Sequence, residues 1–138
     1  MVHKPKILLI DDDQALLHMY SLKFKIDDIY ELLTADNPEQ GLARAKESSP
    51  ALILLDLVLP KGAQSFGHLN KEIGFHVLEE LKRDKRTAGI PVVILTNLDE
   101  KTQGNVERAK KLGAVDYWVK ANVKPAEVIE RVNELLRS

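Results

Sequence analysis

Acidic, hydroxyl and amino side chains stand in this sequence at the points where short apolar runs end. These residues are Asp11, Asp12, Asp13, Asp56, Thr96 and Lys120. Carboxylates that lie close together repel one another, so they either take up protons or bind a hard cation such as Mg²⁺. A divalent cation, a lysine and a hydroxyl group together suit phosphoryl chemistry. The residue types therefore indicate a phosphoryl site, provided that the fold brings them together.

One aspartate of such a site can itself be the nucleophile, because a carboxylate can form an acyl phosphate. Asp56 is the candidate, since it stands alone at the end of an apolar run, whereas Asp11 and Asp12 resemble a metal-binding pair. Asp13 is expected to cap the helix that follows it.

Apolar runs alternate with helical patterns along the whole chain. The expected strands are Ile7–Ile10, Tyr30–Ala35, Ala51–Leu55, Ile90–Leu95 and Tyr117–Val119. The expected helices cover residues 14–26, 38–48, 75–82 and 99–112 and a last segment from Pro125. Leu16, Met19, Tyr20 and Phe24 form the expected apolar stripe of the first helix. This pattern predicts an α/β fold, a single doubly wound five-stranded parallel sheet with five helices.

Right-handed crossovers leave few arrangements for such a sheet, and one of the two common strand orders is 2-1-3-4-5. The other order uses a glycine-rich turn after the first strand, where this chain has aspartates. In the order 2-1-3-4-5, ligands bind at the carboxyl edge between strands one and three. We therefore expect Asp11 and Asp12 to lie next to Asp56, with Thr96 and Lys120 beside them.

Composition narrows the function further. The chain has 138 residues, of which 44% are hydrophobic and 30% charged, which suits one globular domain. The net charge of −1 argues against binding nucleic acid directly. The absence of cysteine excludes disulfides and thiolate zinc sites. We expect no signal peptide, and the sequence has no apolar run of the roughly 18 residues that a membrane span needs. We expect a soluble, cytoplasmic protein.

Four motifs in order carry a resemblance to a known family. They are the segments Ile7–Asp13, Leu54–Pro60, Pro91–Thr96 and Gly113–Lys120. With these motifs the chain resembles the receiver domain of two-component response regulators and is similar to the chemotaxis response regulator. The resemblance covers nearly the whole of residues 1–138.

The resemblance implies a role for each matching residue. Asp56 is the implied phosphoacceptor. The implied ligands of Mg²⁺, for which Mn²⁺ can substitute, are Asp11, Asp12, Asp56 and the backbone carbonyl of Val58. The implied phosphoryl-binding groups are Thr96, Lys120 and the backbone N–H of Asn97, and the implied switch residues are Thr96 and Tyr117. For Tyr117, plain core packing is the other interpretation.

The resemblance also implies partners. A histidine kinase or a histidine phosphotransfer protein would supply the phosphoryl group. Because the last helix ends with the chain, we expect a stand-alone protein whose output is protein–protein contact, which can include a phosphorylation-dependent homodimer. The protein is not expected to be an enzyme with a separate substrate; it would catalyse only its own phosphorylation and dephosphorylation. The downstream target cannot be read from the sequence.

The chain departs from the family pattern in several places. Asn97 is larger than the residue that usually follows the threonine in the family. Residues 61–73 form an insert in the loop after the third strand, between Pro60 and Gly74. Ala121 follows Lys120 where the family usually has proline, which predicts a trans bond.

Two rival functions remain. The first is a receiver-like adaptor that works without phosphorylation, which the insert and Asn97 favour. The second is a phosphohydrolase with an aspartyl intermediate. The phosphohydrolase is disfavoured because Val58 stands where such enzymes carry a second aspartate.

Overall fold

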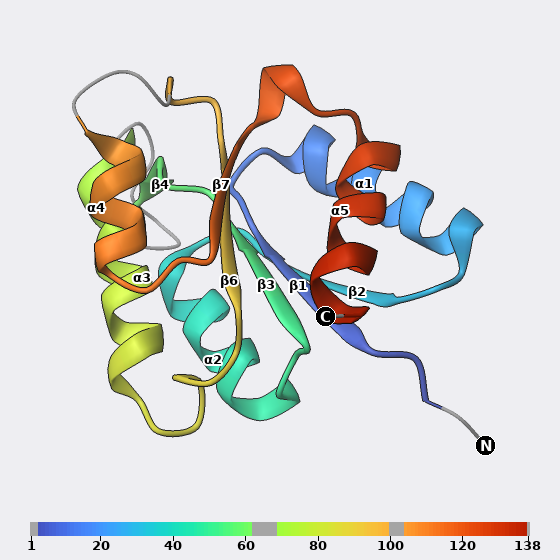
Figure 1. Cartoon of the computed structure of the whole chain (residues 1–138), viewed down its shortest axis with the longest axis horizontal. Helices are drawn as coiled ribbons and strands as arrows, with labels where there is room; N and C mark the ends of the chain where they lie inside the picture. The colour runs from blue at the N-terminus through green and yellow to red at the C-terminus, as the bar shows by residue number, and fades with distance from the viewer. Residues whose placement is uncertain (1–2, 62–68, 100–103, 138) are drawn as a thin grey trace.

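The computed structural model describes residues 3–61, 69–99 and 104–137 (Figure 1). Its strands are β1 (Lys6–Ile10), β2 (Glu31–Ala35), β3 (Leu52–Leu55), β4 (Leu59–Pro60), β5 (Leu69–Asn70), β6 (Val92–Thr96) and β7 (Asp116–Val119). Its α-helices are α1 (Gln14–Asp27), α2 (Pro38–Ser48), α3 (Lys71–Arg83), α4 (Asn105–Lys111) and α5 (Pro125–Arg137), and a 3₁₀ turn spans Lys120–Asn122. Among the described residues, no helix is both long enough and apolar enough to cross a membrane.

The main sheet is parallel and has the order β2-β1-β3-β6-β7. Counted along the chain within this sheet, that is the predicted order 2-1-3-4-5. The structure adds a separate two-stranded antiparallel ladder of β4 and β5, which the sequence did not predict. The predicted fold class is confirmed.

Helices cover both faces of the sheet (Figure 1). Side chains alternate along β1, so that Leu8 and Ile10 pack with α2, α3 and α4, while Ile7 and Leu9 pack with α1 and α5. All four side chains are fully buried. Because the sheet is packed on both faces, the carboxyl ends of its strands are held in fixed positions at one edge. The predicted site residues lie at these strand ends.

The helices begin where short polar side chains can cap them. Asp13 accepts a hydrogen bond from the N–H of Leu16 at the start of α1, and Asn37 accepts one from Gln40 at the start of α2. The cap by Asp13 was predicted. The expected stripe of α1 was wrong at Met19, which is 46% exposed, because the buried face runs through Leu17 instead.

Helix α3 begins earlier than predicted, at Lys71 rather than Phe75. Asn70 caps it by accepting from the N–H of Glu72, so the end of the insert 61–73 belongs to the helix. Gly74 then lies against the backbone of Leu57, and its N–H donates to the Leu57 carbonyl over 3.0 Å. The tip of the insert, residues 62–68, falls outside the described residues.

The predicted helix over 99–112 is shorter in the structure, where α4 begins at Asn105 after Gly104, which has a φ of +64°. Residues 100–103 of that prediction lie outside the described part of the chain.

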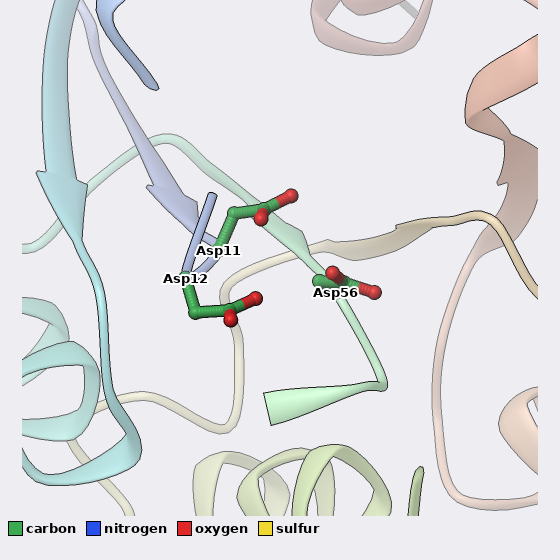
Figure 2. A group of neighbouring side chains, drawn as sticks. All are labelled: Asp11, Asp12 and Asp56. Atoms are coloured by element: carbon green, nitrogen blue, oxygen red, sulfur yellow. The ribbon is translucent and has the colours of Figure 1, made fainter. Parts of the chain in front are cut away.

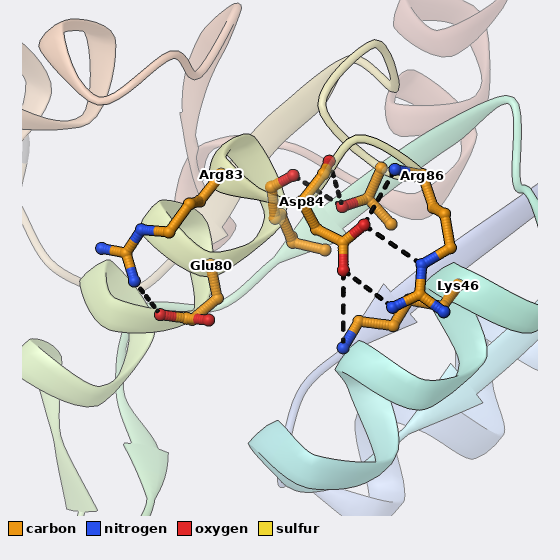
Figure 3. Close-up of polar contacts among 7 residues, drawn as sticks. Lys46, Glu80, Arg83, Asp84 and Arg86 are labelled. Atoms are coloured by element: carbon orange, nitrogen blue, oxygen red, sulfur yellow. Dashed lines mark hydrogen bonds and ion pairs between the residues drawn. The ribbon is translucent and has the colours of Figure 1, made fainter.

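At the far end of α3, a polar network fastens the helix to its surroundings (Figure 3). Asp84 accepts from the backbone N–H and the guanidinium of Arg86 and lies 3.8 Å from the Lys46 ammonium of α2. These contacts lower the pKa of Asp84 to about 2, chiefly through its hydrogen bonds with Arg86. Nearby, Glu80 and Arg83 pair within the helix.

Candidate functional site

The backbone ladder of the sheet brings the acidic residues together. The N–H of Asp11 donates to Ala35 of β2, and the N–H of Asp56 donates to Ile10 of β1, each over 2.9 Å. Asp11 and Asp56 therefore stand on neighbouring strand ends, and Asp12 lies beside them (Figure 2). The predicted meeting of the three carboxylates is confirmed.

The same local turn orients two of these carboxylates. Oδ1 of Asp11 accepts from the N–H of Asp13 over 2.9 Å, and Oδ1 of Asp56 accepts from the N–H of Val58 over 3.2 Å. An aspartate that bonds the backbone N–H two residues further on in this way forms an Asx turn. Each turn fixes one oxygen and leaves the other oxygen of the carboxylate, Oδ2, free to face the site.

Lys120, at the end of β7, faces both of those oxygens. Its Nζ lies 2.5 Å from Oδ2 of Asp11 and 3.0 Å from Oδ2 of Asp56, and only 12% of its side chain is exposed. Burial lowers the pKa of Lys120, but the charges of Asp56 and Asp11 outweigh this effect and raise the pKa overall. The lysine is thus held protonated next to the predicted phosphoacceptor.

The carboxylates outnumber the lysine. Asp11, Asp12 and Asp56 each offer an oxygen within 4.8 Å of the others. Burial, followed by the charge of Asp56, raises the pKa of Asp11 to about 6, and the same causes raise the pKa of Asp12. Oδ2 of Asp11 is buried and accepts no hydrogen bond from the described residues. Its polar contact with them is the ion pair with the Lys120 ammonium. An oxygen-only donor set with excess negative charge fits a hard dication such as Mg²⁺.

This crowding predicts a pH-dependent stability for the metal-free protein. The pKa of Asp11 is about 6 in the folded chain and 3.8 ordinarily, so the folded state binds its proton more tightly. Stability should therefore fall as pH rises from about 4 to about 6, by at most about 3 kcal/mol from this residue. We expect Asp11→Asn to raise the free energy of unfolding by about 1–2 kcal/mol at pH 7.5. The neutral amide removes a buried charge that Asp56 repels, but it also loses the ion pair with Lys120, so the gain is smaller than about 3 kcal/mol.

Urea unfolding at pH 4 and pH 7.5, in a chelator, measures this effect. Asp13→Asn is the matched control, since Asp13 is exposed and an asparagine can still cap α1. If Asp11→Asn raised the free energy of unfolding equally at both pH values, the ionisation of Asp11 would not be the cause.

The remaining predicted residues also lie at this edge of the sheet. Thr96 is fully buried at the end of β6, and its Oγ1 accepts from the N–H of Leu98 over 3.5 Å. Tyr117 is 5% exposed, packs in the core and donates its hydroxyl to the Leu98 carbonyl over 3.1 Å. Both interpretations of Tyr117 thus stay open. Asn97 is exposed and Val58 partly so, and the roles of their backbone groups stay predictions.

The bond between Lys120 and Ala121 is trans, as predicted, and the chain enters the 3₁₀ turn Lys120–Asn122 directly.

A family model described as the response regulator receiver domain matches residues 7–133. The chain belongs to this family. The match covers every strand end described above, so the acidic cluster, Thr96 and Lys120 of this receiver domain all fall within it.

Known proteins agree with this assignment. Over 133 residues the domain is 38% identical to the DNA-binding dual master transcriptional regulator RpaA of Synechocystis. The matched region covers 96% of this chain but 49% of that protein. It is 31% identical to protein PilH of Pseudomonas aeruginosa, with 97% of that protein covered. The chain thus spans about half the length of some curated relatives and nearly all of another. A CheY-like receiver structure from Methanospirillum hungatei superposes with a TM-score of 0.80 at 25% identity, covering 97% of this chain and 94% of that one.

Sequence reasoning missed several residues around the site. The Leu98 carbonyl that holds Tyr117, and the contact between Gly74 and Leu57, depend on tertiary packing and left no signal in the pattern. Glu72 and Arg108, which join α3 to α4, were missed because α3 was predicted to begin after Glu72. Asn70 followed by Glu72 was the available signal, since asparagine is a common N-cap and acids favour the first turn.

Proposed function

We propose that this receiver domain accepts a phosphoryl group on Asp56 in a two-component phosphorelay. The observation that carries the proposal is that Asp56 lies on a central strand end with one oxygen against the Lys120 ammonium and two further carboxylates within reach of a shared cation. Asp11, Asp12, Asp56 and the Val58 carbonyl would hold Mg²⁺. When bound, Mg²⁺ supplies positive charge that neutralises the carboxylates and the incoming phosphoryl oxygens.

The transfer requires little of the protein beyond positioning and charge. An oxygen of Asp56 forms a bond to phosphorus while the P–N bond of a donor phosphohistidine breaks, and the departing imidazole nitrogen takes up a proton. The ammonium of Lys120 faces the phosphoryl oxygens, and the Thr96 hydroxyl and the Asn97 N–H donate to them. The donor would be a histidine kinase or a histidine phosphotransfer protein.

The acceptor is not expected to turn over a separate substrate. Its chemistry would be limited to accepting the group, including from a small acyl phosphate, and to losing it by hydrolysis. Val58 and Leu98 flank the site and are apolar, so their side chains cannot hydrogen-bond an attacking water. This favours a long-lived phosphoryl group.

Phosphorylation would act on a two-state element. A phosphoryl group competes for the Thr96 hydroxyl, which now accepts from the Leu98 N–H. Leu98 also holds the Tyr117 hydroxyl through its carbonyl, so a movement of Thr96 reaches Tyr117 through one residue. The resulting change of surface around α4 and β7 would alter which protein binds, or would favour a homodimer.

Titration with beryllium fluoride, a phosphoryl mimic, tests this function and separates it from an adaptor that works without phosphorylation. Trp118, the single tryptophan, lies on β7 two residues before Lys120 and reports the titration by fluorescence. We expect saturable binding that needs Mg²⁺ and is lost in Asp56→Asn. Mg²⁺-independent binding, or no binding in the wild type, would contradict the proposal and favour the adaptor.

A further inference from the structure

The first turn of α3 is joined to α4 by polar contacts that no part of the phosphoryl site explains. The Arg108 guanidinium of α4 donates to both carboxylate oxygens of Glu72 in α3, over 2.6 and 2.8 Å. One residue before Glu72, the Lys71 ammonium donates to Oδ1 of Asn105 over 3.3 Å. We call the Glu72–Arg108 pair the α3–α4 clasp.

Although the clasp lies on the surface, two hydrogen bonds and an aromatic ring fix the position of its guanidinium. Two parallel N–H···O bonds fix a guanidinium more tightly than one. The same guanidinium lies 3.9 Å above the ring centroid of Phe75, which is itself fully buried. Arg108 is therefore held from two sides, although 41% of its side chain and 53% of that of Glu72 are exposed.

Helix α4 has little else in its own sequence to fix it. It is seven residues long, and Gly104 at its start provides no side-chain cap among the described residues. Helices this short are marginal without tertiary contacts. Ala109 and the partly buried Val106 pack against the core cluster that includes Phe75 and Tyr117, but apolar contacts of this kind have no direction. The clasp supplies two directional bonds, in addition to the hydrogen bond from Lys71 to Asn105.

The α3 side of the clasp is tied to the segment that follows Asp56. Strands β4 and β5 pair Leu59 with Asn70, the residue that caps α3. The N–H of Gly74 donates to the Leu57 carbonyl, and an added Cβ at Gly74 would lie 2.2 Å from that residue. The first turn of α3 is thus fixed relative to the phosphoacceptor loop, and the clasp extends this fixed frame to α4.

We propose that the α3–α4 clasp is a positioning pair that opposes phosphorylation of Asp56. It holds α4 in the arrangement in which Thr96 contacts Leu98 and Lys120 contacts the carboxylates. This inference rests on the proposed function and concerns its regulation. A phosphoryl group draws Thr96 and Lys120 to itself, and Thr96 is joined through Leu98 to the segment that leads into α4. Any displacement of α4 relative to α3 must then break the clasp.

Beryllium fluoride affinity in the presence of Mg²⁺ measures this effect. An exposed bidentate pair contributes a modest free energy, so we expect Glu72→Gln and Arg108→Lys each to tighten the affinity by about two- to fivefold. The two effects should not add in the double variant, since either change alone breaks the clasp. Charge exchange, Glu72→Arg with Arg108→Glu, should restore part of the wild-type affinity.

Glu80→Gln is the matched control. It removes the same charge from an ion pair with Arg83, at 2.6 Å, in the last turn of the same helix (Figure 3). Amide hydrogen exchange of α4 without the mimic is the second readout, and should quicken in Glu72→Gln but not in Glu80→Gln. A change in the free energy of unfolding with unchanged affinity and unchanged α4 exchange would overturn the clasp.

These readouts keep the two proposals apart. Failure of the wild type to bind beryllium fluoride would contradict the proposed function. Amide hydrogen exchange of α4 needs no mimic, so it would still test the clasp. Wild-type binding together with equal affinities for Glu72→Gln, Glu80→Gln and the wild type would overturn the clasp alone.

Discussion

Lys120→Met should slow phosphorylation by acetyl phosphate about a hundredfold, because a charged group aimed at the reacting oxygens is worth about 10²–10³ in rate. The structure places the Lys120 ammonium 3.0 Å from the Asp56 carboxylate and buries most of the lysine side chain, so no solvent ion can replace it at the same position. Methionine keeps the apolar length of the side chain and removes the charge.

The same substitution should have the opposite effect on Mg²⁺. Removing a positive charge that faces Asp11 and Asp56 leaves those carboxylates more negative, and the affinity for Mg²⁺ should rise roughly tenfold. A general loss of structure would weaken both properties, so the opposed signs identify an electrostatic cause. Lys124→Met, at an exposed position four residues further on, is the control and should change neither. Slower phosphorylation with weaker Mg²⁺ binding would contradict this account.

Gly74→Ala should destabilise the fold by about 3 kcal/mol, at the upper end of what overpacking normally costs. A Cβ at this position would lie 2.2 Å from both Cα and the carbonyl oxygen of Leu57. Both are backbone atoms that cannot rotate away, so α3 or the loop after Asp56 must move. Because Leu57 follows Asp56 directly, we also expect slower phosphorylation at temperatures where the variant is folded.

Gly89→Ala is the matched control for that prediction. No atom lies within 4 Å of a Cβ added at Gly89, so the same change should leave the free energy of unfolding within about 0.5 kcal/mol. Urea denaturation of the two variants gives both values. Equal stabilities for the Gly74 and Gly89 variants would show that the contact between α3 and Leu57 is not tight.

Much of the fold follows from local pattern. The apolar runs predicted all five strands of the main sheet. The signal was clearest for the central strands β1, β3 and β6, because strands that are buried on both faces need apolar residues at nearly every position. Asp13 predicted the start of α1, because its short polar side chain can bond a free N–H group there. The start of α3 was missed, although Asn70 offered the same kind of signal, because this cap lies within the insert, where β4 pairs with β5.

The site was predictable to the extent that it follows strand ends. Asp11 and Asp56 meet because a parallel sheet aligns its carboxyl ends, so knowing the strands and their order was sufficient. The clasp between Glu72 and Arg108 was not predictable, because the two residues are 36 positions apart on separate helices and their meeting depends on how those helices pack.

The most direct test of phosphoryl acceptance at Asp56 is the intact mass of the protein after incubation with acetyl phosphate and Mg²⁺, for the wild type and Asp56→Asn together. We predict that the wild type gains the mass of one phosphoryl group, that a chelator prevents the gain, and that Asp56→Asn gains nothing. An equal gain in Asp56→Asn, or no gain in a wild type shown separately to bind Mg²⁺, would contradict the account.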